Sequence, residues 1–284
     1  YGYIPFDKSA ELETVSKAME FSIADASLAK VAREAGDMEA AAYFGERSQA
    51  WKKHYDPEAG FVRGRAADGS WRTPFDPFKA IHMKSDFTEG NAWQYTFLVP
   101  QDVNGLAGII GGPEAFEAKL DEFFTVEGDL GPEANDVTGL VGQYAHGNEP
   151  SHHAAYMYNY IGRHDKCAEK VRYILDELYF DDHSGVCGNE DAGQMSAWYV
   201  LSALGLYQVD PACGVFQFGS PVVKKAVVNL GDGKTFTITA HDNSPENIYI
   251  KSASLNGKKL DRTYVSYDEI MAGGTLEFFM SPEA

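Results

Sequence analysis

The sequence is poor in cysteine, lacks a long apolar run and has few basic residues. Its three cysteines, Cys167, Cys187 and Cys213, form neither a CxxC pair nor the Cys/His spacing of a zinc site. We therefore expect free thiols, with at most one bridge. No run of about 18 apolar residues is present, and the first residues, YGYIPFDKSAEL, lack both the basic start and the apolar core of a secretory signal. The sequence predicts no membrane-spanning helix.

The shortage of basic charge argues against nucleic acid as a partner. Lys and Arg number 24 against 42 Asp and Glu, which gives a net charge of −18 at pH 7, and no basic run offsets it locally. The electrostatic field of such a negative net charge repels the phosphate backbones of nucleic acids. Phosphate-binding loops, dinucleotide-binding fingerprints and the HExxH, EF-hand and GxSxG motifs are also missing, so the corresponding enzyme classes have no local support.

The composition is that of a globular protein. Of the 284 residues, 44% are hydrophobic and 23% are charged. This is enough for a core that needs no disulfide or structural metal. The length allows one large domain or two modest ones.

The first two thirds of the sequence show the 3.6-residue spacing of helices, interrupted by long loops. One pair of helices is expected around Gly36-Asp37, where glycine suits the left-handed position that ends a helix. Further helices are expected in DFTEGNAWQYTFLV with Thr88 as cap, in PEAFEAKLDEFF from Pro113, after Pro150 with Ser151 as cap, and in DKCAEKVRYILDELY and AGQMSAWYVLSALG. This alternation is typical of helical hairpins packed around a toroid, with functional loops at one end.

Beyond Pro211 the hydrophobic period changes from 3.6 to 2, and turns such as GDG and NG separate the apolar runs. We therefore expect a mainly helical domain over residues 1–211 and a small C-terminal antiparallel β unit over residues 212–284.

Acidic residues stand beside amide and aromatic residues at three junctions between a loop and a helix. They are Glu89 in TEGNAWQY, Glu149 in HGNEPSHH, and Glu190 with Asp191 in CGNEDAGQ. Each one alone is explained by the helix dipole, which favours negative charge in the first turn. Three such junctions in one chain favour a second explanation. Two carboxyl groups about 6.5–9.5 Å apart form the acid and base of an inverting glycosidase.

The histidine pair His152-His153 does not indicate a zinc site, because adjacent helical residues point about 100° apart. We expect one of them to hydrogen-bond a sugar hydroxyl and the other to be a buried, satisfied histidine. Asn148, Glu149 and Asp191 offer hard oxygen ligands that suit calcium.

Aromatic side chains near these junctions have two possible roles. Trp93, which follows Glu89 closely, could stack on a pyranose ring or pack in the core. The pattern of residues leaves both roles open.

Four long segments of the sequence resemble those of a known family. DFTEGNAWQYTFLVPQD, GLVGQYAHGNEPSHHAAYMYNY, CGNEDAGQMSAWYVLSALGLYQVDP and FQFGSPVVKKAVV, in this order, are similar to the calcium-dependent exo-acting α-mannosidases of glycoside hydrolase family 92. Weaker similarity extends over essentially the whole chain. The resemblance implies that residues 1–211 are part of an (α/α)6 catalytic toroid.

The resemblance also implies an activity and roles for particular residues. The expected reaction is the removal, with inversion, of terminal α-mannose, most often α-1,2-linked, from N-glycans or mannans. Glu89 matches the general acid of the family. Glu190 and Asp191 match the acidic pair that supplies the base, and Asp191 is preferred. Calcium, contacting mannose hydroxyls near Asn148, Glu149 and Asp191, is the expected cofactor. A secreted, periplasmic or cell-surface location in bacteria is also implied.

This chain departs from the family pattern in two respects. It has Glu190-Asp191 where the family usually has two aspartates, and Gln101 where histidine is frequent. It is also several hundred residues shorter than family members. The resemblance implies that a β-sandwich domain precedes the toroid in those proteins. We expect a C-terminal fragment that lacks the N-terminal β-sandwich and the early helices. Such a fragment can be inactive alone.

Two alternative functions remain open. One is a mannose-binding protein without turnover on a decayed glycosidase scaffold, which the presence of both Glu89 and Asp191 disfavours. The other is a mannosyl-phosphate diesterase. Family members with that activity replace the acid by glutamine, since a phosphate leaving group needs little protonation. The retained Glu89 argues for ordinary glycosides.

Overall fold

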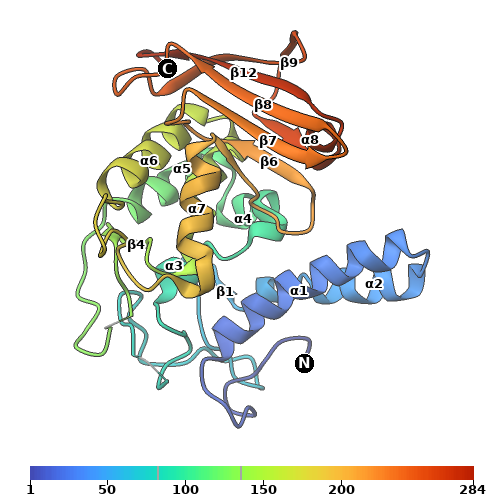
Figure 1. Cartoon of the computed structure of the whole chain (residues 1–284). Coiled ribbons are helices and arrows are strands. Elements are labelled where there is room, and N and C mark those ends of the chain that lie inside the picture. The colour runs from blue at the N-terminus through green and yellow to red at the C-terminus, as the bar shows by residue number, and fades with distance from the viewer. Residues whose placement is uncertain (82, 135) are drawn as a thin grey trace. The chain divides into compact units, whose positions relative to one another are not determined.

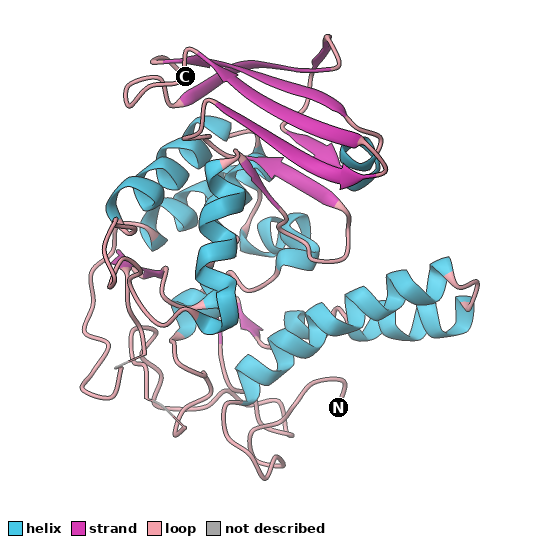
Figure 2. Cartoon of the chain, viewed as in Figure 1, coloured by secondary structure: helices cyan, strands magenta, loops and turns pink. Residues whose placement is uncertain are grey.

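The computed structural model describes residues 1–81, 83–134 and 136–284. The chain divides into two compact units, Tyr1–Ser151 and His152–Ala284, called here the N-terminal and C-terminal units. Figure 2 shows long loops between the helices of the N-terminal unit, whereas the larger strands belong to the C-terminal unit. Beyond residue 211, where the sequence predicts a second domain, the elements are strands and one short helix.

The N-terminal unit is built from helices, turns of 3-10 helix and two-residue strands. In chain order they are α1 (Thr14–Glu34), α2 (Met38–Arg47), η1 (Ala50–Lys53), β1 (Tyr55–Asp56), β2 (Phe61–Val62), α3 (Ala92–Thr96), η2 (Pro100–Asp102), α4 (Val103–Ile110), α5 (Pro113–Phe123), β3 (Leu140–Val141), β4 (Tyr144–Ala145) and η3 (Glu149–Ser151).

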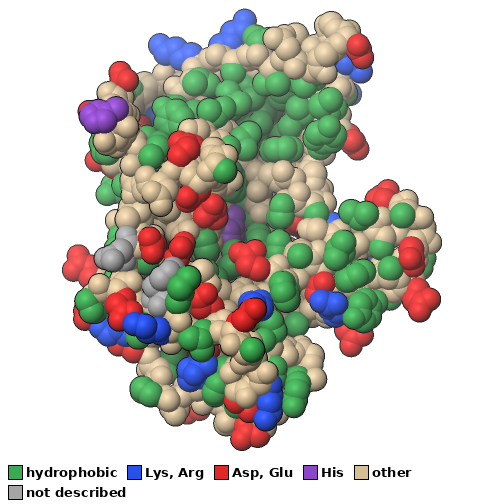
Figure 3. Space-filling model, turned by 60° about the horizontal axis from the view of Figure 1, so that its bottom comes forward, with side chains coloured by type: hydrophobic (Ala, Val, Ile, Leu, Met, Phe, Trp, Pro, Cys, Tyr) green, Lys and Arg blue, Asp and Glu red, His purple; other side chains and the backbone are tan. Residues whose placement is uncertain are grey.

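Helices α1 and α2 form the expected hairpin (Figure 1). Gly36 adopts a φ of 80°, as predicted, and the side chain of Asp37 caps α2 by accepting from the N–H of Ala40. Helix α1 is apolar on two sides: Met19 is fully buried, whereas Val31 is 65% exposed. This hairpin is the lobe at the right of Figure 3, and hydrophobic side chains are visible on its surface.

The core beside α3 is aromatic. Trp93 is 2% exposed, and its ring centroid lies 4.7 Å from that of Phe61 and 6.4 Å from that of Phe123. Phe97 and Phe123 approach to 4.6 Å. Buried aromatic side chains of this size each contribute about 1.5–3 kcal/mol or more through the area they remove from water. The cluster fixes the position of α3 and of the loop before it.

Two helix starts differ from the sequence expectation. Asn91, not Thr88, caps α3, because the Gln94 side chain completes a capping box with Asn91. The segment after Pro150 is a 3-10 helix, η4 (Ala154–Ile161), and the Ser151 hydroxyl accepts from the N–H of Ala145 instead of capping a helix.

The C-terminal unit combines several helical segments with a β unit. After η4 its elements are α6 (His164–Glu177), η5 (Asp191–Gly193), α7 (Gln194–Ala203), β5 (Leu206–Tyr207), β6 (Val215–Phe218), β7 (Lys225–Gly231), β8 (Lys234–His241), β9 (Tyr249–Leu255), β10 (Lys258–Leu260), β11 (Tyr264–Ser266), α8 (Tyr267–Met271) and β12 (Gly274–Ser281). Helices α6 and α7 lie where the sequence predicts them.

The β unit contains a five-stranded sheet in the order β10-β9-β12-β8-β7 and a three-stranded sheet in the order β11-β6-β5. All pairs are antiparallel except β12 with β8, which is parallel. Alternate residues of β8 and β12, Phe236, Ile238, Leu276 and Phe278 among them, form the core. None of the helices in the described part of the chain combines the length and hydropathy needed to cross a bilayer.

The register of β12 can be tested by a pair of neighbouring substitutions. Phe278→Ala should lower the free energy of unfolding of the C-terminal unit by about 3–5 kcal/mol, because Phe278 is fully buried. Phe279 points to the other face, is 39% exposed and stacks on His241, so Phe279→Ala should cost about 1 kcal/mol. Denaturant titration measures both, and equal losses would contradict this register.

Candidate active site

Glu89 lies in the loop before α3, and its backbone is left-handed, with a φ of 45°. Residues other than glycine, asparagine and aspartate rarely adopt this region, which costs of order 1–3 kcal/mol. Glu89 is half-buried. The next residue, Gly90, approaches α3 so closely that a Cβ atom there would lie 3.1 Å from the Tyr95 ring. The loop therefore holds Glu89 in a conformation that its neighbours must stabilise.

Buried side-chain amides supply part of this stabilisation. Asn91 Oδ1 accepts from the N–H of Trp93 at 2.9 Å, and Gln94 Oε1 accepts from the N–H of Asn91 at 2.7 Å. Asn91 Nδ2 also donates to Gln143 Oε1 at 2.9 Å, and Gln94 Nε2 donates to the Gln143 carbonyl at 2.5 Å. All three amides are buried, so an unpaired one would cost about 1–3 kcal/mol. They tie the Glu89 loop to the segment around Gln143.

The same segment leads to Asn148 and Glu149. Asn148 Nδ2 donates to the backbone carbonyl of Glu89 at 2.8 Å. Glu149 begins η3 and is exposed. The structure therefore brings two of the three predicted acidic junctions, 59 residues apart at this bond, into one region of the N-terminal unit.

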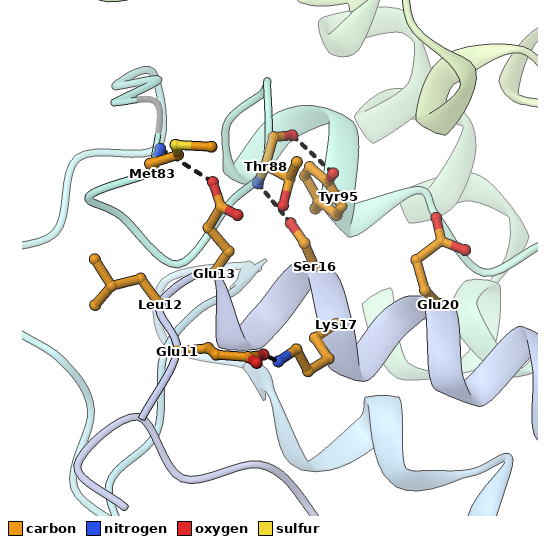
Figure 4. Close-up of a pocket in the computed structure, with 9 residues that line it drawn as sticks. All are labelled: Glu11, Leu12, Glu13, Ser16, Lys17, Glu20, Met83, Thr88 and Tyr95. Atoms are coloured by element: carbon orange, nitrogen blue, oxygen red, sulfur yellow. Dashed lines mark hydrogen bonds and ion pairs between the residues drawn. The ribbon is translucent and has the colours of Figure 1, made fainter. Parts of the chain in front are cut away.

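A hollow of about 600 Å³ opens beside Thr88, the residue before Glu89 (Figure 4). The Ser16 hydroxyl accepts from the N–H of Thr88 at 2.7 Å, and the Tyr95 hydroxyl donates to the Thr88 carbonyl at 2.8 Å. Both backbone groups of Thr88 are thus fixed by side chains from α1 and α3.

Glu20 is a carboxylate of this region that sequence reasoning missed. It projects from α1 and lines the hollow (Figure 4). Although its side chain is partly open to solvent, burial raises the pKa of Glu20 above its ordinary value, and the negative charge of Glu149 raises it further. No motif marks Glu20 in the sequence, because only the fold brings α1 near Glu149.

In the C-terminal unit, Asp191 and Ala192 both have left-handed backbones, with φ of 52° and 55°. Glu190 has a structural role, since its two carboxylate oxygens accept from the N–H of Ser196 at 3.1 Å and from the Ser196 hydroxyl at 3.0 Å. It therefore stabilises the start of α7. This is the structural role that the helix dipole gives to an acidic residue in the first turn of a helix. Asp191 lies on the exposed turn between Glu190 and α7.

His152 and His153 are both buried. His152 Nδ1 lies 3.1 Å from Gln194 Nε2, and the His152 carbonyl accepts from the indole N–H of Trp198 at 2.9 Å. Gln194 is the first residue of α7, so these contacts anchor the helix that follows Asp191. His152 has the contacts of a buried, hydrogen-bonded histidine, and which of His152 and His153 contacts a sugar stays a prediction.

Trp93 occupies the aromatic core of the N-terminal unit, where protein side chains surround its ring. This is the packing role, one of the two left open by the sequence. Stacking of Trp93 on a pyranose stays a prediction.

The predicted calcium ligands belong to both units: Asn148 and Glu149 to the first and Asp191 to the second. Their oxygen donors are the type that calcium prefers. The repulsion between Glu20 and Glu149 is also one that a bound cation would relieve. Within the described ranges, no group of three or more His, Cys, Asp or Glu is arranged to hold a metal ion. The donor chemistry fits calcium, and the ligand set stays a prediction.

Loops on a helical scaffold that present carboxylates agree with a glycosidase catalytic region, whose chemistry uses a pair of Asp or Glu residues. Residues 1–282 match the model described as the glycosyl hydrolase family 92 catalytic domain, and the chain belongs to this family.

Solved and curated relatives agree with this assignment. The family GH92 α-mannosidase BT3965 from Bacteroides thetaiotaomicron, solved in complex with mannoimidazole, is 41% identical with a TM-score of 0.94, and the match covers 99% of this chain and 38% of that one. The family GH92 inverting mannosidase BT2199 from Bacteroides thetaiotaomicron VPI-5482 is 36% identical with a TM-score of 0.88, covering 99% and 39%. An uncharacterized secreted glycosidase of Arthroderma benhamiae is 28% identical over 312 residues, covering 99% and 38%.

Two facts follow for the fold. The expected class, part of an (α/α)6 toroid of helical hairpins followed by a C-terminal β unit, is confirmed. The chain spans less than two fifths of the length of these relatives.

The left-handed turn beside Asp191 can be tested without assaying activity. Ala192→Gly should raise the free energy of unfolding by about 0.5–1 kcal/mol, because the left-handed region costs alanine roughly 1–2 kcal/mol and costs glycine little. Ala197→Gly is the control: Ala197 is equally exposed but lies inside α7, and its replacement should lower stability by about 1 kcal/mol. Denaturant titration would refute the turn geometry if both variants were destabilised.

Proposed function

We propose that this chain carries the acid and base of an inverting exo-α-mannosidase, which releases terminal α-1,2-linked mannose from N-glycans or mannans. Membership of family 92 supports glycosidase chemistry, and the relative BT2199 is described as an inverting mannosidase. The observation that carries the residue assignment is that Glu89 occupies left-handed backbone, which glutamate rarely adopts, and that Asp191 adjoins Ala192, for which this backbone is also costly. Strain of this kind concentrates at functional sites.

In this proposal Glu89 is the general acid and Asp191 the general base. Glu89 donates its proton to the glycosidic oxygen as the bond to the anomeric carbon breaks. Asp191 removes a proton from a water molecule that attacks the anomeric carbon from the opposite face. The released sugar is therefore β-mannose. Solvent then returns a proton to Glu89 and removes one from Asp191.

Other residues orient these groups and the sugar. Glu190 assists Asp191 by fixing the start of α7 through Ser196. Glu149 and His153 bind mannose hydroxyls, and His152 holds α7 through Gln194.

Calcium is the proposed cofactor, with Asn148, Glu149 and Asp191 as oxygen ligands. When bound, it would neutralise carboxylate charge and polarise mannose hydroxyls. The raised pKa of Glu20, caused in part by Glu149, is consistent with a region that is too negative without a cation.

The full protein is proposed to contain an N-terminal β-sandwich and the early toroid helices. The limited coverage of the relatives supports this proposal. So does the exposed apolar side of α1, where Phe21, Leu28 and Val31 are uncovered in this chain. A secreted, periplasmic or cell-surface location is also proposed, supported by the Arthroderma relative described as secreted.

Glu89→Gln tests the acid assignment. On α-1,2-mannobiose, kcat should fall about 10²–10⁴-fold, because the leaving alkoxide then departs without a proton. On 2,4-dinitrophenyl α-mannoside, whose leaving group needs little protonation, the loss should be small. Steady-state kinetics on both substrates measures this difference.

Glu114→Gln is the matched control, since Glu114 is an exposed acid in the first turn of α5. It should leave both rates unchanged. Full turnover of mannobiose by Glu89→Gln would mean that Glu89 is a structural acidic residue at the start of a helix and not the general acid. Retained cleavage of mannosyl phosphodiesters alone would favour the diesterase, and sugar binding without turnover by the wild type would favour the binding protein.

A further inference from the structure

The backbone around Glu89 is held at several points by side chains from other segments. Ser16 and Tyr95 fix the two backbone groups of Thr88, and Gln94 fixes the N–H of Asn91. At Glu89, Asn148 Nδ2 donates to the backbone carbonyl at 2.8 Å. The φ of Glu89 is 45°, in the left-handed region.

Asn148 is well placed to hold this carbonyl because it projects from a rigid segment. Gln143 and His146 are buried, and the Tyr144 hydroxyl lies 2.7 Å from His146 Nδ1. The N–H of Gly147 donates to the Thr138 carbonyl at 3.1 Å. A Cβ atom on Gly147 would lie 2.0 Å from Thr138 Oγ1, so the backbone packs closely there.

We infer that Asn148 is a positioning residue for the acid: its amide donor holds Glu89 in the left-handed conformation that aims the carboxyl group at the glycosidic oxygen. The inference rests on the proposed function of Glu89. It assigns a role to the side-chain amide nitrogen of Asn148, whereas the proposed calcium contact uses only the side-chain oxygen. The two roles are therefore separable by chemistry.

Asn148→Asp separates them. An ionised aspartate keeps an oxygen ligand for a cation, but it cannot donate to the Glu89 carbonyl and repels it instead. Asn148→Ala removes both the amide donor and the oxygen ligand. If positioning is the role, the two variants behave alike. If metal binding alone is the role, Asn148→Asp retains wild-type behaviour.

The first measurement compares kcat/KM on α-1,2-mannobiose and on 2,4-dinitrophenyl α-mannoside. Both Asn148 variants should lose about 10- to 100-fold on mannobiose, because small misplacement of a catalytic group costs this much. They should lose much less on the activated substrate. Asn159→Ala is the matched control, because Asn159 Nδ2 donates to the Phe218 carbonyl at the same 2.8 Å, and it should leave the ratio of the two rates unchanged. Equal losses on both substrates, or a wild-type ratio in Asn148→Asp, would overturn the inference.

The second measurement does not need turnover. The ¹³Cα and amide chemical shifts of Glu89 and Gly90 report the backbone conformation. They should move in Asn148→Ala and Asn148→Asp but not in Asn159→Ala, and unchanged shifts would overturn the inference. If the wild-type chain is inactive alone, as such a fragment can be, the kinetic comparison fails for a reason unrelated to Asn148, and the shifts alone decide its role.

Discussion

The hydrogen bonds among buried side-chain amides are the interaction on which the N-terminal half of the candidate site depends. Asn91, Gln94 and Gln143 satisfy one another and the backbone between them, and each would be costly to leave unpaired. The aromatic cluster around Trp93 excludes water from this region. A low dielectric strengthens paired groups and penalises unpaired ones. The network therefore specifies one loop conformation, and that loop carries Glu89.

The two halves of the candidate site hold their carboxylates by different means. Glu89 depends on side chains distant in sequence, Asn148 among them. Asp191 depends on a local turn, because Glu190 binds Ser196 on α7 and the left-handed residues 191–192 connect the two. In both cases the backbone is fixed before a substrate arrives. Acid–base catalysis benefits from this arrangement, since no free energy is then needed to orient the reacting groups.

The sequence predicts much of the fold because its signals are local. The hairpin around Gly36, the start of α5 at Pro113 and the strands beyond residue 211 follow from periodicity and turn residues. The cap of α3 could not be assigned reliably, since Thr88 and Asn91 are both good caps and the Gln94 side chain decides between them. The motifs identified the acidic junctions and the family. They did not reveal Glu20 or the Asn148 contact, because these depend on segments that only the fold brings together.

The anomeric form of the first mannose released is the sharpest test of the acid and base assignment. The purified chain, with calcium, is incubated with α-1,2-mannobiose, and ¹H NMR spectra are recorded before mutarotation equilibrates the product. We expect β-mannose to appear first, since water attacks opposite the leaving group. Initial α-mannose would contradict the assignment of Glu89 and Asp191 as an inverting pair, whereas no release would mean that this chain is inactive without the proposed N-terminal β-sandwich.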